Sequence, residues 1–114
     1  MSLPIIVKNS KIPKLMSWVI DVYAITLWPF VFVRDEGNER TLRHETIHIK
    51  QYNELFVLGF LFLYLYDWLH GVIKYKDTQK AYYQIRFEQE AYRNDKDPEY
   101  LSIRKCYSWR NYSV

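Results

Sequence analysis

The chain has 114 residues, 18% of them aromatic, and a formal net charge of +3. This length predicts one domain over residues 1–114, with a modest core. Charges of both signs are interspersed, so the sequence does not indicate a nucleic-acid partner. The single cysteine, Cys106, excludes an internal disulfide and a zinc site built from several cysteines.

The N-terminal third is expected to be extended. Residues 3–14 predict an extended lead-in with a short strand and lack the pattern of a secretory signal peptide, which favours a cytoplasmic or membrane-associated location. Residues 17–24 fit a helix or a strand equally well. Residues 25–34 are rich in β-branched and aromatic side chains and predict one strand. Pro29 lacks an N–H group, which predicts the edge of a sheet, and residues 35–38 predict a turn.

Helices are expected in the rest of the chain. The first begins near Asn38 or Thr41 and continues into the apolar residues 55–66, unless Gly59 or Gly71 breaks it. Residues 55–73 fit a buried core helix, with a membrane-surface or membrane-spanning segment as the alternative. A second helix is predicted over 78–93, and a third over 98–109, where Pro98 follows a possible cap. The fold class is therefore α+β, mostly helical.

The first predicted helix carries the motif His44-Glu45-Thr46-Ile47-His48, written H-E-x-x-H. Histidines four residues apart lie on one helix face, one turn apart, and both can reach one metal ion. Glu45 points about 100° around the helix from His44, beside such a metal. It is placed to take a proton from water activated by zinc. The motif therefore predicts a Zn²⁺ site with His44 and His48 as ligands and Glu45 as general base.

A catalytic zinc site needs a third protein ligand. His70 is one candidate, although a core or capping role explains it more simply. Glu88 and Glu90 on the next predicted helix are better candidates, and their spacing points them to nearly opposite faces, so one of them is expected at the metal. Asp67, inside the apolar run, is expected to pair with Arg86 or to accept a hydrogen bond from a zinc-bound histidine.

The H-E-x-x-H motif followed by Phe87-Glu88-x-x-Ala91 resembles the gluzincin metallopeptidases. Within that group it is similar to membrane-associated peptidases whose third-ligand helix reads Glu-x-x-Ala-Asp. The same motif pair also resembles that of small bacterial proteins of uncharacterised function, over residues 40–112. The resemblance implies Glu88 as third ligand, and it implies that Tyr92 stands where the family has an aspartate that supports a zinc-bound histidine.

The resemblance further implies a zincin-like core, with a short N-terminal edge-strand sheet, the H-E-x-x-H helix and a following third-ligand helix. The edge strand at 25–34 would pair with an extended peptide or protein substrate. Tyr82, Tyr83 and Arg86 are candidates for stabilising the oxyanion.

The leading hypothesis is thus a zinc metallopeptidase. The alternative is a non-catalytic zinc-binding or interaction module, with possible membrane-surface contact through residues 55–73. A deformylase-type hydrolase would need a cysteine ligand upstream of the motif.

Overall fold

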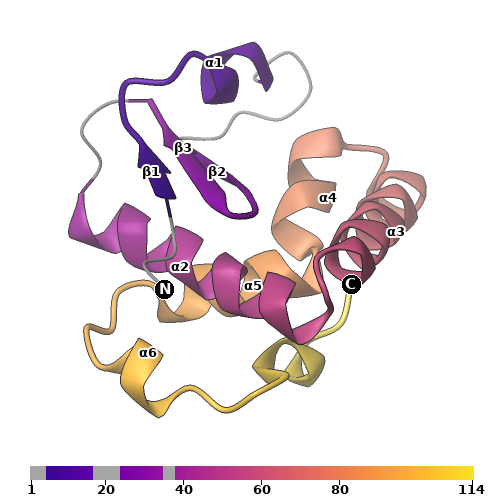
Figure 1. The fold of residues 1–114 in the computed structure, drawn as a ribbon. Coiled ribbons are helices and arrows are strands. Elements are labelled where there is room, and N and C mark those ends of the chain that lie inside the picture. Colours follow the sequence, from indigo (N-terminus) through magenta and orange to yellow (C-terminus); the bar gives the residue numbers. More distant parts are fainter. Residues whose placement is uncertain (1–4, 17–23, 35–37) are drawn as a thin grey trace.

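The computed structural model describes residues 5–16, 24–34 and 38–114. It is α+β and mostly helical, as predicted, with one small sheet and a set of helices below and beside it (Figure 1). Most of the expected turn at 35–38 and most of the ambiguous segment 17–24 lie outside the described residues. The lead-in contains the expected strand, β1 (Ile5–Val7), but it continues into a short helix, α1 (Ile12–Met16).

Residues 25–34 form a hairpin of two strands, which corrects the prediction of one strand. β2 (Ala24–Leu27) and β3 (Phe30–Val33) pair antiparallel, and β1 pairs parallel with β3, so the sheet order is β1-β3-β2. Pro29 lies in the turn between the strands. A residue without an N–H group cannot continue the ladder, and it is accommodated where the chain reverses. β1 and β2 are therefore the two edges of the described sheet, and β2 is the edge that packs on α2.

The H-E-x-x-H helix is α2 (Glu39–Glu54), and it begins as predicted. The side chain of its N-cap residue Asn38 accepts a hydrogen bond from the backbone N–H of Thr41 at 2.7 Å. The helix ends earlier than expected. Phe56 and Val57 have positive φ, and α3 (Leu58–Tyr75) then departs at 114° from α2. Neither Gly59 nor Gly71 causes this break, because both lie inside α3.

The predicted helix at 78–93 is two helices, α4 (Thr78–Gln84) and α5 (Arg86–Asn94), separated by Ile85 in an extended conformation. The predicted helix at 98–109 is also wrong. It is replaced by α6 (Tyr100–Ile103) and a 3₁₀ helix, η1 (Ser108–Asn111). The break at Ile85 allows α4 to pack against α3 while α5 packs against α2.

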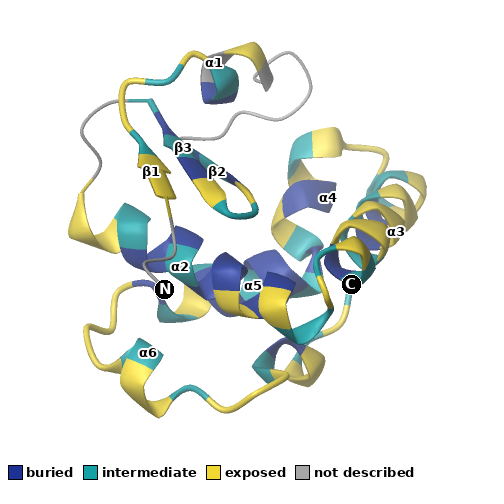
Figure 2. Cartoon of the chain, in the orientation of Figure 1, coloured by how far each residue is buried: buried dark blue, intermediate teal, exposed yellow. Residues whose placement is uncertain are grey.

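Two apolar clusters hold these elements together. One lies under the sheet and contains Ala24, Val31, Val33 and Ile49. The other joins α2, α3, α4, α5 and η1 and is largely aromatic; its members are Tyr52, Phe60, Tyr82, Ile85, Phe87 and Trp109. Buried residues therefore concentrate where α2 and α5 face each other, whereas exposed residues recur along the whole of α3 (Figure 2).

Candidate metal centre

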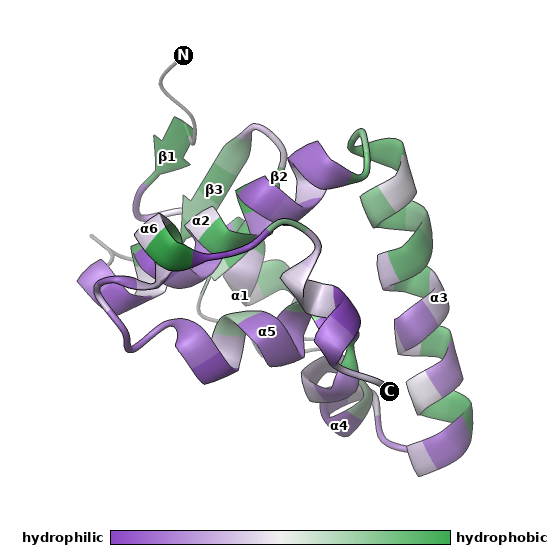
Figure 3. Cartoon of the chain, turned by 90° about the horizontal axis from the view of Figure 1, so that it is seen from below, coloured by the Kyte–Doolittle hydropathy of each residue, from purple (hydrophilic) through white to green (hydrophobic). Residues whose placement is uncertain are grey.

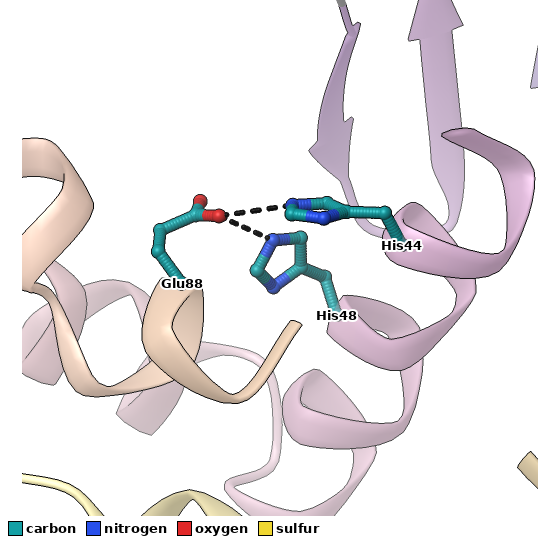
Figure 4. A group of neighbouring side chains, drawn as sticks. All are labelled: His44, His48 and Glu88. Carbon is teal, nitrogen blue, oxygen red and sulfur yellow. Dashed lines mark hydrogen bonds and ion pairs between the residues drawn. The ribbon is translucent and has the colours of Figure 1, made fainter. Parts of the chain in front are cut away.

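α2 and α5 bring three predicted ligands to one point. His44 and His48 project from one face of α2, and Glu88 projects from α5 toward both imidazoles (Figure 4). Glu88 Oε1 lies 3.1 Å from His44 Nε2 and 3.0 Å from His48 Nε2. All three side chains are buried. Residues 40 or more positions apart in the sequence thus converge on one small polar volume.

The donor set has the chemistry and spacing of a metal site. One ligand atom from each residue lies within 4.8 Å of the others, and this group could hold a metal ion. Two imidazole nitrogens and one carboxylate oxygen suit zinc, which binds such donors at about 2.0–2.1 Å. In a tetrahedral site, donors at that range are about 3.3 Å apart. The separations of 3.0 and 3.1 Å between Glu88 and the histidines are close to this value.

Each of the three ligands is also held by a hydrogen bond on its far side. His44 Nδ1 lies 2.9 Å from Asp95 Oδ2, and His48 Nδ1 lies 2.7 Å from Gln51 Oε1. Tyr64 donates its hydroxyl to Glu88 Oε2 at 2.6 Å. These contacts occupy the Nδ1 atoms and the second carboxylate oxygen. They leave Nε2 of each imidazole and Oε1 of the carboxylate directed at the shared point.

The orientation of Gln51 follows from its other contacts. Its Nε2 donates to the Phe87 carbonyl at 3.1 Å and to Glu90 Oε1 at 3.0 Å. The amide oxygen must then face His48, where it accepts a hydrogen bond from the Nδ1–H group. When His48 gives up its second proton to a metal ion, this hydrogen bond keeps the remaining proton on Nδ1 and leaves the lone pair on Nε2. The carboxylate of Asp95 does the same for His44.

The electrostatics of the cluster favour positive charge at its centre. Burial alone would lower the pKa of His44, but its hydrogen bonds to Asp95 and Glu88 raise that pKa to about 10. The charge of Glu88 raises the pKa of His48 in the same way, against burial. Burial would raise the pKa of Glu88, yet the two histidines hold it well below its usual range. A bound divalent cation would take the place of the imidazole protons.

Glu45 lies beside this cluster, at the wall of a cavity of about 220 Å³. Thr26 on β2 donates its hydroxyl to Glu45 Oε2 at 2.7 Å, which orients the carboxylate. His48 and Glu88 line the same cavity, and its remaining wall is mostly apolar or aromatic, from Ala24, Ile25, Leu27, Tyr52, Phe60, Leu61, Tyr64 and Tyr82. The cavity therefore gives a bound molecule access to the cluster between β2, α2 and α3.

The structure distinguishes the remaining candidates. Glu90 points away from the cluster and pairs with Arg104 at 2.6 Å, fully buried. His70 is exposed on α3, away from the cluster, so the expected core or capping role is wrong. Asp67 pairs with Arg86 through both guanidinium Nε and Nη2, at 2.9 Å each, so it does not support a histidine.

Of the oxyanion candidates, Tyr82 lines the cavity. Arg86 is held by the ion pair with Asp67, and Tyr83 is 45% exposed and does not line the cavity. Tyr82 shares a hydrogen bond of 2.7 Å with the hydroxyl of Tyr92. It is therefore the candidate best placed to meet a molecule in the cavity.

Asp95, Gln51 and Tyr64 were missed from the sequence. Tyr92 does not take the role of the missing aspartate, because its ring packs on His44 at 4.3 Å. The carboxylate that contacts His44 Nδ1 is that of Asp95, at the C-cap of α5. Its sequence signal is the spacing from Glu88: seven residues are two helical turns, which return to the same face. The spacing of three between His48 and Gln51 is a similar signal.

Comparisons with protein-family models, with curated protein sequences and with solved structures give no match for this chain. The interpretation of the site therefore depends on its own geometry.

Proposed function

We propose that this chain is a zinc-dependent metallopeptidase with a zincin-like core, of the gluzincin type. The observation that carries the proposal is the hydrogen bond behind each ligand. Asp95, Gln51 and Tyr64 leave three donor atoms directed at one point, beside a carboxylate and an open cavity. A buried cluster with no ligand to bind would not need three separately fixed donors.

His44 Nε2, His48 Nε2 and Glu88 Oε1 would hold the ion. Zinc bound there supplies a Lewis acid that makes water a nucleophile near pH 7. Glu45 takes one proton from the attacking water as the water oxygen bonds to the substrate carbonyl carbon. It then delivers that proton to the amide nitrogen as the carbon–nitrogen bond breaks. The hydrogen bond from Thr26 keeps the Glu45 carboxylate at the cavity wall for both transfers.

The cavity supports a peptide as substrate. β2 is one of the two edge strands of the described sheet, and it contributes Ala24 to Leu27 to the cavity wall. An extended peptide can pair with the backbone of such an edge, while its side chains enter pockets on alternate sides. The predicted substrate edge is therefore β2 and not the whole of 25–34. The apolar wall favours a large apolar side chain next to the scissile bond.

The test is the Glu45→Gln variant, with Glu39→Gln as matched control. Glu39 lies on the same helix and its side chain is exposed. Glu45→Gln should bind one zinc per chain, measured by mass spectrometry of the metal. It should hydrolyse a mixed peptide library at least about 100-fold more slowly than wild type. Glu39→Gln should match wild type in both measurements.

Undiminished hydrolysis by Glu45→Gln would refute the mechanism. Stoichiometric zinc in the wild type, without hydrolysis of any library peptide, would instead favour the alternative of a non-catalytic zinc-binding module. Absence of zinc binding in the wild type would contradict both.

A further inference from the structure

α3 presents its apolar side chains to the outside. Exposed residues recur along one face from Leu58 to Ile73, and all are apolar or aromatic except His70; the others are Leu61, Phe62, Leu65, Tyr66 and Leu69. Phe62 is 74% exposed and Ile73 is 77% exposed. In Figure 2 exposed residues recur along α3, and in Figure 3 hydrophobic residues recur along the same helix, most densely in its N-terminal half. We call this surface the α3 apolar face.

The acidic residue of α3, Asp67, faces inward. Asp67 is 1% exposed and pairs with Arg86, and Gly71 allows α4 to approach closely. The inner face is thus satisfied by the fold, and the helix is firmly packed on α4. Contiguous apolar surface of this kind marks an interaction site in a folded protein.

Lysines mark one end of the α3 apolar face. Lys74 and Lys76 are exposed, and Lys80 of α4 lies 4.6 Å from the Tyr75 ring, which brings it to the same end. Between Leu55 and Lys76 the one acidic residue is Asp67, which is buried. At this end of α3 the exposed Lys74, Lys76 and Lys80 therefore outnumber one exposed acidic residue, Asp77.

We propose that the α3 apolar face seats this protein on the surface of an anionic phospholipid bilayer. The apolar residues enter the boundary between headgroups and acyl chains, and the lysines meet lipid phosphates. The face offers few groups for directional hydrogen bonds, which a fluid lipid surface does not require. Tyr66 and His70, each with an apolar ring and a polar atom, suit the headgroup level.

A second copy of the chain fits this face less well. Two copies that meet through α3 would bring the lysines of one against a surface with no exposed acidic residue in residues 55–76. Lipid phosphates supply the missing counter-charge.

Among the described residues, no single helix is long and apolar enough to span a membrane. α2 and α3 together have the length and composition of a membrane span, but the chain is sharply bent between them.

Binding of the α3 apolar face to a bilayer would also determine which molecules reach the cavity. Leu61 belongs to the α3 apolar face and also lines the cavity next to Glu45. Phe60 and Tyr64 of the same helix line it as well. A bilayer under α3 would therefore border the cavity, and molecules at the membrane surface would reach it first.

The experiment is sedimentation of the full chain with vesicles of phosphatidylcholine, with and without phosphatidylglycerol. Phe62→Ser combined with Ile73→Ser should lower the partition coefficient at least about tenfold, since each side chain loses apolar contact. The matched control is Leu15→Ser combined with Ile103→Ser, two comparably exposed apolar residues at 67% and 65% on other elements. The control should bind as wild type does, and melting curves should show that both variants are folded.

Binding to the phosphatidylglycerol vesicles should also fall about fivefold for each lysine replaced in Lys74→Gln and Lys76→Gln. Three results would overturn the proposal. The first is that the wild type binds neither kind of vesicle. The second is that the control variant loses as much binding as Phe62→Ser with Ile73→Ser. The third is that the wild type is a dimer that does not bind vesicles and that Phe62→Ser with Ile73→Ser dissociates. Light scattering measures the third. None of these measurements depends on metal or on hydrolysis.

Discussion

Replacing Asp95 with asparagine is expected to weaken zinc binding by about 10- to 100-fold while the protein stays folded. Asp95 Oδ2 lies 2.9 Å from His44 Nδ1, and the side chain is buried. The negative charge of Asp95 holds the imidazole in place and makes it a stronger donor to a metal. The neutral amide of asparagine removes that charge. A loss of this size corresponds to about 1.4–2.7 kcal/mol of binding free energy.

The assay is competition for zinc against a chelating indicator. Asp97→Asn is the matched control, because Asp97 is an exposed acid two residues further along that caps the backbone N–H of Glu99. It should bind zinc as wild type does. Asp95 also pairs with Arg40 at 2.9 Å, so Arg40→Gln tests whether loss of that ion pair alone matters. We expect less than about a threefold change for Arg40→Gln, since the Arg40 side chain is half exposed and solvent weakens its attraction to Asp95.

An Asp95→Asn variant that binds zinc within twofold of wild type would refute the argument. It would show that the hydrogen bond to His44 is a feature of packing and does not orient a ligand. A loss as large in Arg40→Gln as in Asp95→Asn would also refute it, because the ion pair would then be the cause.

Three further predictions follow from the same geometry. Glu88→Ala should lower the zinc affinity more than about 100-fold. Glu90→Ala should retain zinc but lose roughly 3 kcal/mol of unfolding free energy, since it breaks a buried ion pair. Zinc and urea titrations of both variants separate the two effects, and loss of zinc in Glu90→Ala alone would contradict the prediction. Zinc binding at pH 7 should release protons and strengthen as pH rises, because the pKa of His44 is raised to about 10 and its proton must leave first; equal heats of binding in two buffers of different ionisation enthalpy would contradict this. Gly71→Ala should lower the unfolding free energy by about 1–3 kcal/mol, because a new Cβ would lie 2.9 Å from a side chain of α4; Gly59→Ala, with 3.3 Å to its nearest neighbour, is the control, and equal melting temperatures would be the contrary result.

The features that were predicted from sequence are those set by local spacing. The cap at Asn38 and the four-residue interval of the histidines act within one helix, so the pattern alone indicated the start of α2 and the pairing of His44 with His48. The fold class also followed from the order of strand-forming and helix-forming segments. Glu88 was reached by resemblance to a family, and α5 delivers it to the two histidines.

The features that were missed depend on packing between elements. Phe56 and Val57 favour continuing the helix or forming a strand, and a β-branched residue with positive φ is uncommon. The bend forms there because Tyr52 and Phe60 stack across it with ring centroids 3.8 Å apart, and the Tyr52 carbonyl accepts from the backbone N–H groups of Leu55 and Val57. No local pattern reports that stacking, so the glycines were the natural but wrong candidates for the break.

The break at Ile85 shows the same limit, with a consequence for the site. A continuous helix over 78–93 would keep α4 and α5 on one line, although α4 packs on α3 and α5 packs on α2. The extended residue Ile85 resolves this conflict, and its side chain is buried in the aromatic cluster. Glu88 therefore reaches the histidines because the third-ligand helix is free to turn from the helix before it.

The buried charges around the cluster link stability to metal binding. The described part of the chain buries nearly as many polar as apolar side chains, a costly arrangement unless each charge is paired. Arg104 with Glu90, and Arg43 with the Asp95 carbonyl, meet that requirement within the protein. Glu88 meets it through the two imidazoles, which must hold protons to do so. A divalent cation satisfies the same carboxylate without those protons, so the folded arrangement of α2 against α5 and the affinity for metal are two aspects of one equilibrium.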